Sequence, residues 1–155
     1  MKIGFTIGKF APFHKGHGYL IETALKEMDK FYIVIYETDL IKNTIQERAK
    51  WIKEKYPEVE ILYAENPPKQ YGLDKESVEI QMKYLYPIIE NIKPTHFYSS
   101  EPYGKCVAEY LNIIDRRVDP KREEYPISST QIRDDLNNNI NWLEKHVYKE
   151  FIIKK

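Results

Sequence analysis

The chain has 155 residues, and its 24 Lys and Arg residues balance its 24 Asp and Glu residues, so the formal net charge is zero. A neutral chain offers no overall field to nucleic acid or to an anionic membrane, and any phosphate binding must depend on local clusters of donors. The single cysteine, Cys106, excludes an internal disulfide, and no apolar run approaches the roughly 20 residues that span a bilayer.

Apolar runs with strand character alternate with helical patterns along the chain. Strands are expected at residues 3–7, 31–36, 59–63, 95–99 and 113–118, and helices at residues 18–28, 45–56, 75–91 and 103–111. Pro87 is a candidate break in the third helix, and short helices from Ser129 and from Asn141 are expected to close the chain. Such alternation requires crossover connections, so the expected fold class is α/β, a Rossmann-like, doubly wound and mostly parallel sheet.

We expect residues 1–155 to form a single domain, because a chain of this length can bury roughly 68–70% of its unfolded surface. The first residues lack the basic and apolar segments of a signal peptide, so the expected location is cytoplasmic. The sequence does not fix the oligomeric state and leaves a homo-oligomer open.

The stretch GKFAPFHKGH, residues 8–17, follows the first expected strand directly. A Gly-containing loop between a parallel strand and a helix binds phosphates, because the first N–H groups of the helix are unpaired and partly positive. His14 and His17 are three residues apart and can converge on one anion, and Lys9 adds a cation. A surface loop with two solvated histidines is the less favoured alternative.

A second candidate phosphate-binding segment is ISSTQIR, residues 127–133, just before a further helical pattern. Ser128 or Ser129 is a good N-cap for that helix. Thr130 adds a hydroxyl near the free N–H groups, and Arg133 can present a planar fork of donors to phosphate oxygens. Taken alone, the segment is also typical of an ordinary helix N-cap followed by a solvent-exposed arginine. Together with the first motif, it favours phosphate binding.

HKGH, in this position after a first strand, resembles the HxGH signature of the α/β-phosphodiesterase nucleotidyltransferases, and ISSTQIR resembles their second signature, ISxTxxR. YSSEPYG, residues 98–104, and VDPKREEYPISST, residues 118–130, are similar to one branch, the nicotinamide-mononucleotide adenylyltransferase domain of the bifunctional NAD-biosynthesis regulators. The resemblance extends over residues 2–151. Ser129 stands where that branch usually has Gly. Other branches of the family carry Ser at this position.

The resemblance implies direct attack by the 5′-phosphate of nicotinamide mononucleotide on the α-phosphorus of ATP, which forms NAD and pyrophosphate. It implies that His14 and His17 contact the α- and β-phosphates, that Lys9 contacts the entering or transferring phosphate, and that Arg133 holds the leaving group. A phosphate monoester is already anionic, so no strong general base is required. The implied cofactor is Mg²⁺, bound chiefly by the ATP phosphates and water, and the sequence shows no metal-binding cluster of its own.

Further nucleotide-binding candidates belong to the two motifs and to the loop after the fourth strand. They are Gly8, Phe10, Gly16, Ser99, Glu101, Tyr103, Gly104, Arg122, Ser128, Ser129 and Thr130. The turn at residues 99–104 is assigned to adenosine, whereas Arg122 suits a phosphate contact and a solvated position equally well. Trp51 and Trp142 are the candidates for stacking on the nicotinamide ring, although a buried structural role suits Trp51 at least as well.

Two other functions are compatible with these motifs. One is a different transferase of the HxGH type, a cytidylyltransferase or a pantetheine-phosphate adenylyltransferase, against which SSEPYG and the spacing of DPKRE favour the NAD branch. The other is a non-catalytic nucleotide-sensing module, against which the intact His14, His17 and Arg133 argue. The expected partners are therefore ATP and nicotinamide mononucleotide, with no nucleic acid and no membrane.

Overall fold

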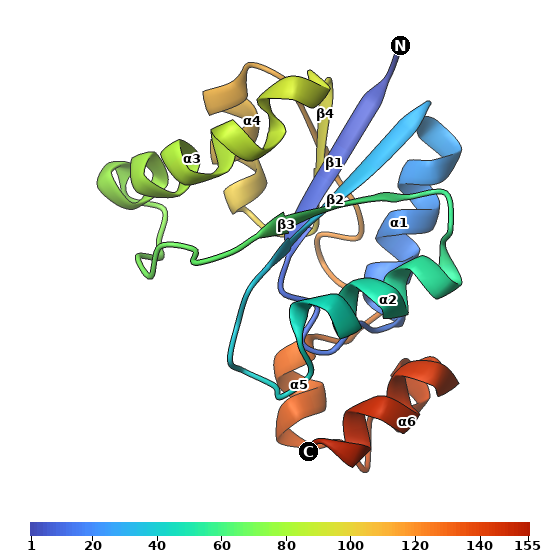
Figure 1. Cartoon of the computed structure of the whole chain (residues 1–155). Helices are drawn as coiled ribbons and strands as arrows, with labels where there is room; N and C mark the ends of the chain where they lie inside the picture. The colour runs from blue at the N-terminus through green and yellow to red at the C-terminus, as the bar shows by residue number, and fades with distance from the viewer.

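A five-stranded sheet forms the centre of the computed structural model, which describes all 155 residues (Figure 1). Its strands are β1 (Ile3–Gly8), β2 (Lys30–Tyr36), β3 (Glu60–Ala64), β4 (His96–Ser99) and β5 (Ile114–Arg117). All pairings are parallel, and the strand order is β3-β2-β1-β4-β5. The doubly wound α/β fold expected from the sequence is confirmed.

Helices cover both faces of the sheet. They are α1 (Lys15–Glu27), α2 (Ile45–Lys55), α3 (Lys75–Ile89), α4 (Tyr103–Leu111), α5 (Ser129–Asp134) and α6 (Lys145–Ile153), with short 3₁₀ turns η1 (Glu90–Ile92) and η2 (Ile140–Trp142). Figure 1 shows α1 and α2 on one side of the sheet and α3 and α4 on the other. None of the helices combines the length and the apolar character that a membrane span requires.

The two faces bury cores of different size. A cluster of 21 buried apolar residues lies on the face of α1 and α2 and includes side chains from α5 and α6. A cluster of 9 lies on the face of α3 and α4. The C-terminal helices therefore complete the larger core.

β1 is the central strand and carries the first motif to the edge of the sheet. It pairs with β2 from Ile3 to Gly8 and with β4 on its other side. The chain winds outward from β1 through β2 and β3 and then returns to the other edge of β1 at β4, so the strand order reverses between β1 and β4. Doubly wound sheets bind ligands in the crevice at the carboxyl ends of such a strand pair.

The start of α1 differs from the prediction. The helix begins at Lys15 rather than at Gly18, because the side chain of His14 caps it. β3 is displaced by one residue from its expected range, and β5 is one residue shorter at each end. α5 begins at Ser129 as expected, and Ser128 is its N-cap.

Two further helical segments also differ from the prediction. α3 continues through Pro87 to Ile89 instead of breaking. Pro87 is exposed and lies in the last turn of α3, where the loss of one backbone N–H donor disturbs the helix little. The buried side chains of Leu85 and Ile89 hold the helix in place on both sides of it. The helix expected from Asn141 is only the 3₁₀ turn η2, and α6 begins at Lys145.

Candidate active site

A cavity of about 660 Å³ lies at the carboxyl ends of the strands. The residues predicted from the two motifs and from the loop after the fourth strand all line this cavity, except Gly104. Gly104 is buried, and a Cβ atom there would collide with Oγ of Ser99 and lie 2.9 Å from Oδ1 of Asp115, so its lack of a side chain serves the packing of α4 against β4 and β5. The fold thus brings together motifs that are far apart in the sequence.

His14 and His17 cap the start of α1 with their own side chains. Nδ1 of His14 accepts hydrogen bonds from the backbone N–H groups of Gly16, at 3.0 Å, and His17, at 3.3 Å. Nδ1 of His17 accepts from the backbone N–H of His14 at 3.1 Å, which closes a capping box. A Cβ at Gly16 would lie 2.8 Å from Cε1 of His14, so glycine is required for this ring to fold back onto the helix.

These hydrogen bonds fix the state of both imidazoles. A ring nitrogen that accepts a hydrogen bond carries no proton, so Nε2 carries the N–H of each neutral ring. Burial, followed by the positive charge of Arg122, lowers the pKa of His14 to about 3. Burial, followed by the charges of His14 and Arg122, holds the pKa of His17 well below its usual value. At pH 7 both rings are therefore neutral Nε2–H donors.

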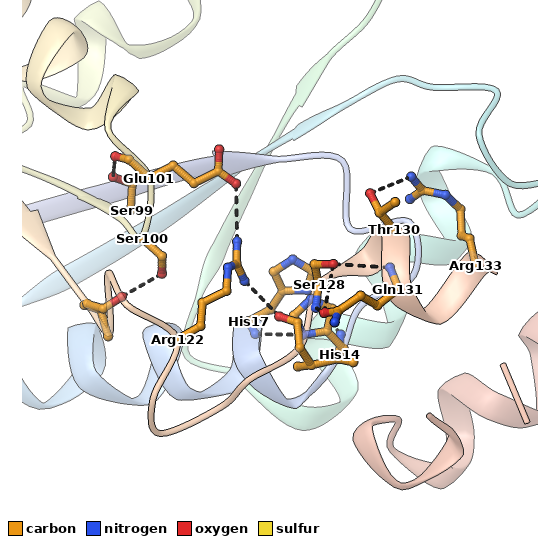
Figure 2. A network of polar contacts seen from close by, with 12 residues as sticks. His14, His17, Ser99, Ser100, Glu101, Arg122, Ser128, Thr130, Gln131 and Arg133 are labelled. Atoms are coloured by element: carbon orange, nitrogen blue, oxygen red, sulfur yellow. Dashed lines mark hydrogen bonds and ion pairs between the residues drawn. The ribbon is translucent and has the colours of Figure 1, made fainter. Parts of the chain in front are cut away.

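The two rings act as one rigid unit. Their centroids are 3.7 Å apart with an angle of 21° between the planes, and Figure 2 shows them side by side. The ring of Phe10 packs edge-on against His17 with centroids 4.7 Å apart. His14 is only 3% exposed, so the rings are held in place before any ligand binds.

The second motif is bonded directly to the loop of the first. Nη1 of Arg133 donates to the carbonyl of Ala11 at 2.6 Å, and Nη2 donates to the hydroxyl of Thr130 at 3.2 Å, as Figure 2 shows for the latter. Oγ of Ser129 donates to the carbonyl of Pro12 at 3.1 Å. The arginine therefore faces the same cavity as the two histidines, with its orientation fixed at two points.

Arg122 reaches across the cavity mouth from the loop after β5. Its Nη1 donates to the carbonyl of Ile127 at 2.8 Å, and its Nη2 lies 3.4 Å from a carboxylate oxygen of Glu101 (Figure 2). The carboxylate of Asp119 accepts the backbone N–H groups of residues 123–125 at 2.8–3.1 Å and so holds the loop that presents Arg122. Arg122 lines the cavity, and its side chain is 38% exposed.

Lys9 lies directly after β1 and contacts an aromatic side chain at the cavity mouth. Its Nζ donates to the hydroxyl of Tyr71 at 2.6 Å and lies 4.7 Å from the centre of that ring. Tyr71 is 69% exposed and belongs to the loop of residues 65–74 between β3 and α3. Sequence reasoning missed Tyr71, because it is one of thirteen tyrosines and no motif surrounds it.

Arg48, in α2, was also missed. It is 1% exposed, and its guanidinium donates to the carbonyls of Lys9 at 2.5 Å, Tyr36 at 3.0 Å and Asn43 at 3.3 Å, with no carboxylate paired to it. It therefore joins the carboxyl ends of β1 and β2 behind the cavity. The available signal was a charged residue within the apolar stripe of a helix, three residues after Ile45.

Neither tryptophan lines the cavity, so neither is placed to stack on a ligand there. Trp51 is 1% exposed, and its indole N–H donates to a carboxylate oxygen of Glu150 in α6 at 2.8 Å. Trp142 packs edge-on against Tyr125 with centroids 6.1 Å apart. Of the two roles considered for Trp51, the structure assigns the buried one.

The family model of cytidylyltransferase-like proteins matches residues 5–135. The chain belongs to this family of nucleotidyltransferases. It is 31% identical over 151 residues to the trifunctional NAD biosynthesis/regulator protein NadR of Escherichia coli and 30% identical to that of Salmonella typhimurium. Each alignment covers 85% of this chain and 36% of the relative, so the chain spans about a third of the length of these relatives.

Solved structures of similar fold share less sequence. A NadR protein in complex with NAD and AMP-PNP has a TM-score of 0.64 at 18% identity, covering 91% of this chain and 44% of its own. A bifunctional NMN adenylyltransferase/ADP ribose pyrophosphatase from Francisella tularensis, complexed with AMP and a manganese ion, has a TM-score of 0.62 at 21% identity, covering 88% and 42%. A putative nicotinate-nucleotide adenylyltransferase from Vibrio parahaemolyticus has a TM-score of 0.57 at 16% identity, covering 98% and 99%. At these identities the likeness establishes the fold.

Proposed function

We propose that this chain transfers AMP from ATP to nicotinamide mononucleotide, forming NAD and pyrophosphate, and that residues 1–155 act as one nucleotidyltransferase domain. The observation that carries the proposal is the pair of neutral imidazoles at the start of α1, which line one cavity together with Lys9 and Arg133. The similarity to NadR of Escherichia coli, a protein of NAD biosynthesis, supports the choice of substrates.

In the proposed reaction an oxygen of the 5′-phosphate of the acceptor attacks the α-phosphorus of ATP. A new phosphorus–oxygen bond forms while the bond from the α-phosphorus to the oxygen bridging to the β-phosphate breaks, and pyrophosphate leaves with that oxygen. No proton has to be removed from the attacking phosphate. Negative charge concentrates on the transferring and leaving phosphoryl oxygens, so donors fixed in advance lower the barrier.

The site residues take the following proposed roles. His14 and His17 donate their Nε2–H groups to the α- and β-phosphates. Lys9 pairs with the entering phosphate, which requires its release from Tyr71. Arg133, with the neighbouring backbone of Ser129, holds the leaving pyrophosphate, because a planar fork matches two phosphate oxygens at once.

The ends of the two substrates are assigned to the remaining parts of the cavity wall. The loop of residues 99–103, together with Arg122, borders adenosine, and Gly8 contributes backbone at the end of β1. Tyr71 offers its exposed ring to the nicotinamide, a flat cation that packs favourably on an aromatic face.

A divalent cation would enter the site with ATP. The carboxylates that line the cavity are those of Glu101, which faces Arg122, and Asp119, which accepts three backbone N–H groups. No group of three or more His, Cys, Asp or Glu side chains is arranged to hold a metal ion. Mg²⁺ held by phosphate oxygens and water fits such a wall, and it would neutralise charge on the triphosphate.

Pyrophosphate release tests the proposal. We would measure it with ATP and with CTP, each combined with nicotinamide mononucleotide, nicotinic acid mononucleotide and 4′-phosphopantetheine. Release with ATP and nicotinamide mononucleotide, and NAD as the product, is the expected result. Faster release with CTP or with phosphopantetheine would assign the chain to another branch of the family. Binding of ATP without release from any pair would favour a nucleotide sensor.

The choice between the amide and the acid is a separate part of the proposal. A site built for the carboxamide offers hydrogen-bond acceptors to the N–H groups of the amide. When the acid binds, these acceptors face a carboxylate and have no donor to pair with. Such mismatches cost about 1–3 kcal/mol, or roughly ten- to a hundredfold in specificity. Competition kinetics should therefore give a kcat/KM at least about tenfold higher for nicotinamide mononucleotide. Equal use of both acceptors would contradict this preference.

A further inference from the structure

One face of α3 lines the cavity and carries a single polar side chain. Val78, Gln81, Met82 and Leu85 recur at intervals of three and four residues, so they lie on one face of the helix, and all four line the cavity. Three of them are apolar. A flat ring with one hydrogen-bonding substituent therefore fits this wall if the substituent meets Gln81.

The amide of Gln81 is held in one orientation. Its Nε2 donates to the carbonyls of Gln70, at 2.6 Å, and Pro68, at 3.2 Å. Carbonyl oxygens only accept hydrogen bonds, so a reversed amide would set oxygen against oxygen at both contacts. Both N–H groups of Gln81 are thus occupied, and no group of the protein donates to its Oε1. What Gln81 can offer a ligand is an acceptor alone.

Gln81 is connected to Lys9 through the loop of residues 65–74. Gln70 accepts a hydrogen bond from Gln81, and the next residue, Tyr71, accepts one from Nζ of Lys9. Lys9 and Gln81 both line the cavity and are joined through adjacent residues of this loop, of which Tyr71 also lines the cavity. An acceptor with its phosphate at Lys9 can direct its ring along this segment toward α3.

We propose that Gln81 is the residue that selects the amide over the acid form of the pyridine mononucleotide, with Oε1 accepting a hydrogen bond from the carboxamide N–H₂. This inference rests on the proposed function and assigns its specificity to one atom. A carboxylate in the same place presents only acceptors, so it makes no hydrogen bond to Oε1 and is repelled by it. The contact is accordingly worth about ten- to a hundredfold in the ratio of kcat/KM values for the two acceptors.

Two substitutions separate recognition from support of the loop. In Gln81→Lys the ammonium can still donate to the carbonyls of Gln70 and Pro68, while the acceptor is replaced by a positive charge. The ratio of kcat/KM for the amide over that for the acid should fall at least about a hundredfold and pass below one. In Gln81→Met the ratio should fall about tenfold, because the acceptor is lost without a new charge.

Tyr84→Phe is the matched control. The hydroxyl of Tyr84 donates to the carbonyl of Glu65 at 2.5 Å, so this change loosens the same loop from the same helix, and Tyr84 does not line the cavity. Its kcat/KM should change by a similar factor for both acceptors, leaving the ratio as in the unaltered protein. Thermal unfolding of all three variants would check that they are folded at the assay temperature.

The outcomes distinguish this inference from the function on which it rests. Turnover of both acceptors with a ratio that is unchanged in Gln81→Lys and Gln81→Met overturns the role of Gln81 and leaves the adenylyltransferase intact. A fall in the ratio as large in Tyr84→Phe as in Gln81→Met shows a loop effect and also overturns it. No turnover of either mononucleotide by the unaltered protein overturns the proposed function and the inference together.

Discussion

The two imidazoles at the start of α1 owe their chemical state to the hydrogen bonds they exchange with the backbone. Each Nδ1 is committed to capping, so each Nε2–H is free to act on a ligand. Each ring therefore caps the helix through Nδ1 and offers a donor to a ligand through Nε2, and a substitution can remove the donor while keeping the cap. Asn places an acceptor close to the Nδ1 position but has nothing where Nε2 was.

We expect His17→Ala and His17→Asn to lower kcat by about the same factor, on the order of 10²-fold, because both lack a donor that acts mainly in the transition state. His17→Ala should be less stable than His17→Asn by about 0.5–1.5 kcal/mol, since it leaves the N–H of His14 without its partner. Steady-state kinetics and urea unfolding at pH 7 measure the two effects. Near-normal turnover in a folded His17→Asn protein would reject the proposed role of Nε2.

The guanidinium of Arg133 donates one hydrogen bond to a carbonyl and one to a hydroxyl. In the proposed function its remaining N–H groups bind the leaving pyrophosphate. Arg133→Lys keeps the charge but loses this geometry, so kcat/KM should fall by roughly ten- to a hundredfold. Arg116→Lys is the control and should leave kcat/KM unchanged, because it makes the same exchange at an arginine that pairs with Glu27 and does not line the cavity. Kinetics of Arg133→Lys equal to those of the unaltered protein would place Arg133 outside the triphosphate site.

Residues within motifs could be predicted from the sequence, and residues that act through tertiary contacts could not. His14, His17, Lys9 and Arg133 converge on one cavity because each follows a strand end or a helix start that the sequence marks. The place of Gln81 beside the cavity depends instead on how the loop of residues 65–74 folds back onto α3. No local pattern encodes that contact.

The first turn of α1 is the element on which the site depends, and its stability should depend on pH. The pKa of His14 is about 3 in the folded chain, against about 6.5 for an unperturbed histidine. Below pH 6.5 the unfolded chain therefore binds protons that the folded chain does not, so the free energy of unfolding falls as the pH falls. The slope is at most about 1.4 kcal/mol per pH unit for each such histidine, and it is lost below the folded pKa.

We expect the free energy of unfolding of the unaltered protein to fall more steeply between pH 6.5 and 5 than that of the double variant His14→Asn and His17→Asn. Asparagine retains the caps, so the two proteins differ mainly in these two titrating groups. Urea unfolding at three pH values in this range measures the difference, and the contribution of His96 is common to both proteins. Parallel curves would show that the histidines are protonated in the folded state.

Elements whose patterns are long and periodic could be placed from the sequence alone. The alternation of strands and helices identified every strand of the sheet. The central strands β1, β2 and β4 are buried apolar runs, whereas the edge strand β5 (IDRR) has no buried residue and was placed by its position after a helical pattern. Two of the differences from the predicted helices depended on side chains acting outside their usual roles. A histidine served as N-cap at position 14, and Pro87 was accommodated on the exposed side of α3.

At the scale of the whole molecule, the larger core reaches the cavity through Phe10, Ile21 and Val118, whereas the part of it that α6 completes does not line the cavity. α6 packs on α2, where Trp51 donates to Glu150 and the imidazole of His146 lies 2.9 Å from the carbonyl of Trp51. Val147 and Phe151 of α6 are buried in the larger core. No residue of α6 lines the cavity, so its contribution should be to stability and not to turnover.

Phe151 and Ile153 provide a test within one helix. Phe151 is 3% exposed and Ile153 is 80% exposed. Phe151→Ala should lower the free energy of unfolding by about 3–5 kcal/mol, because it leaves a cavity in the core, whereas Ile153→Ala should change it by no more than about 0.5 kcal/mol.

Both variants should keep their kcat per folded molecule when assayed well below their unfolding temperatures. Urea unfolding followed by circular dichroism gives the first quantity and pyrophosphate release the second. A folded Phe151→Ala protein with strongly reduced kcat would show that the packing of α6 reaches the site, through α2 and the contact of Arg48 with the carbonyl of Lys9.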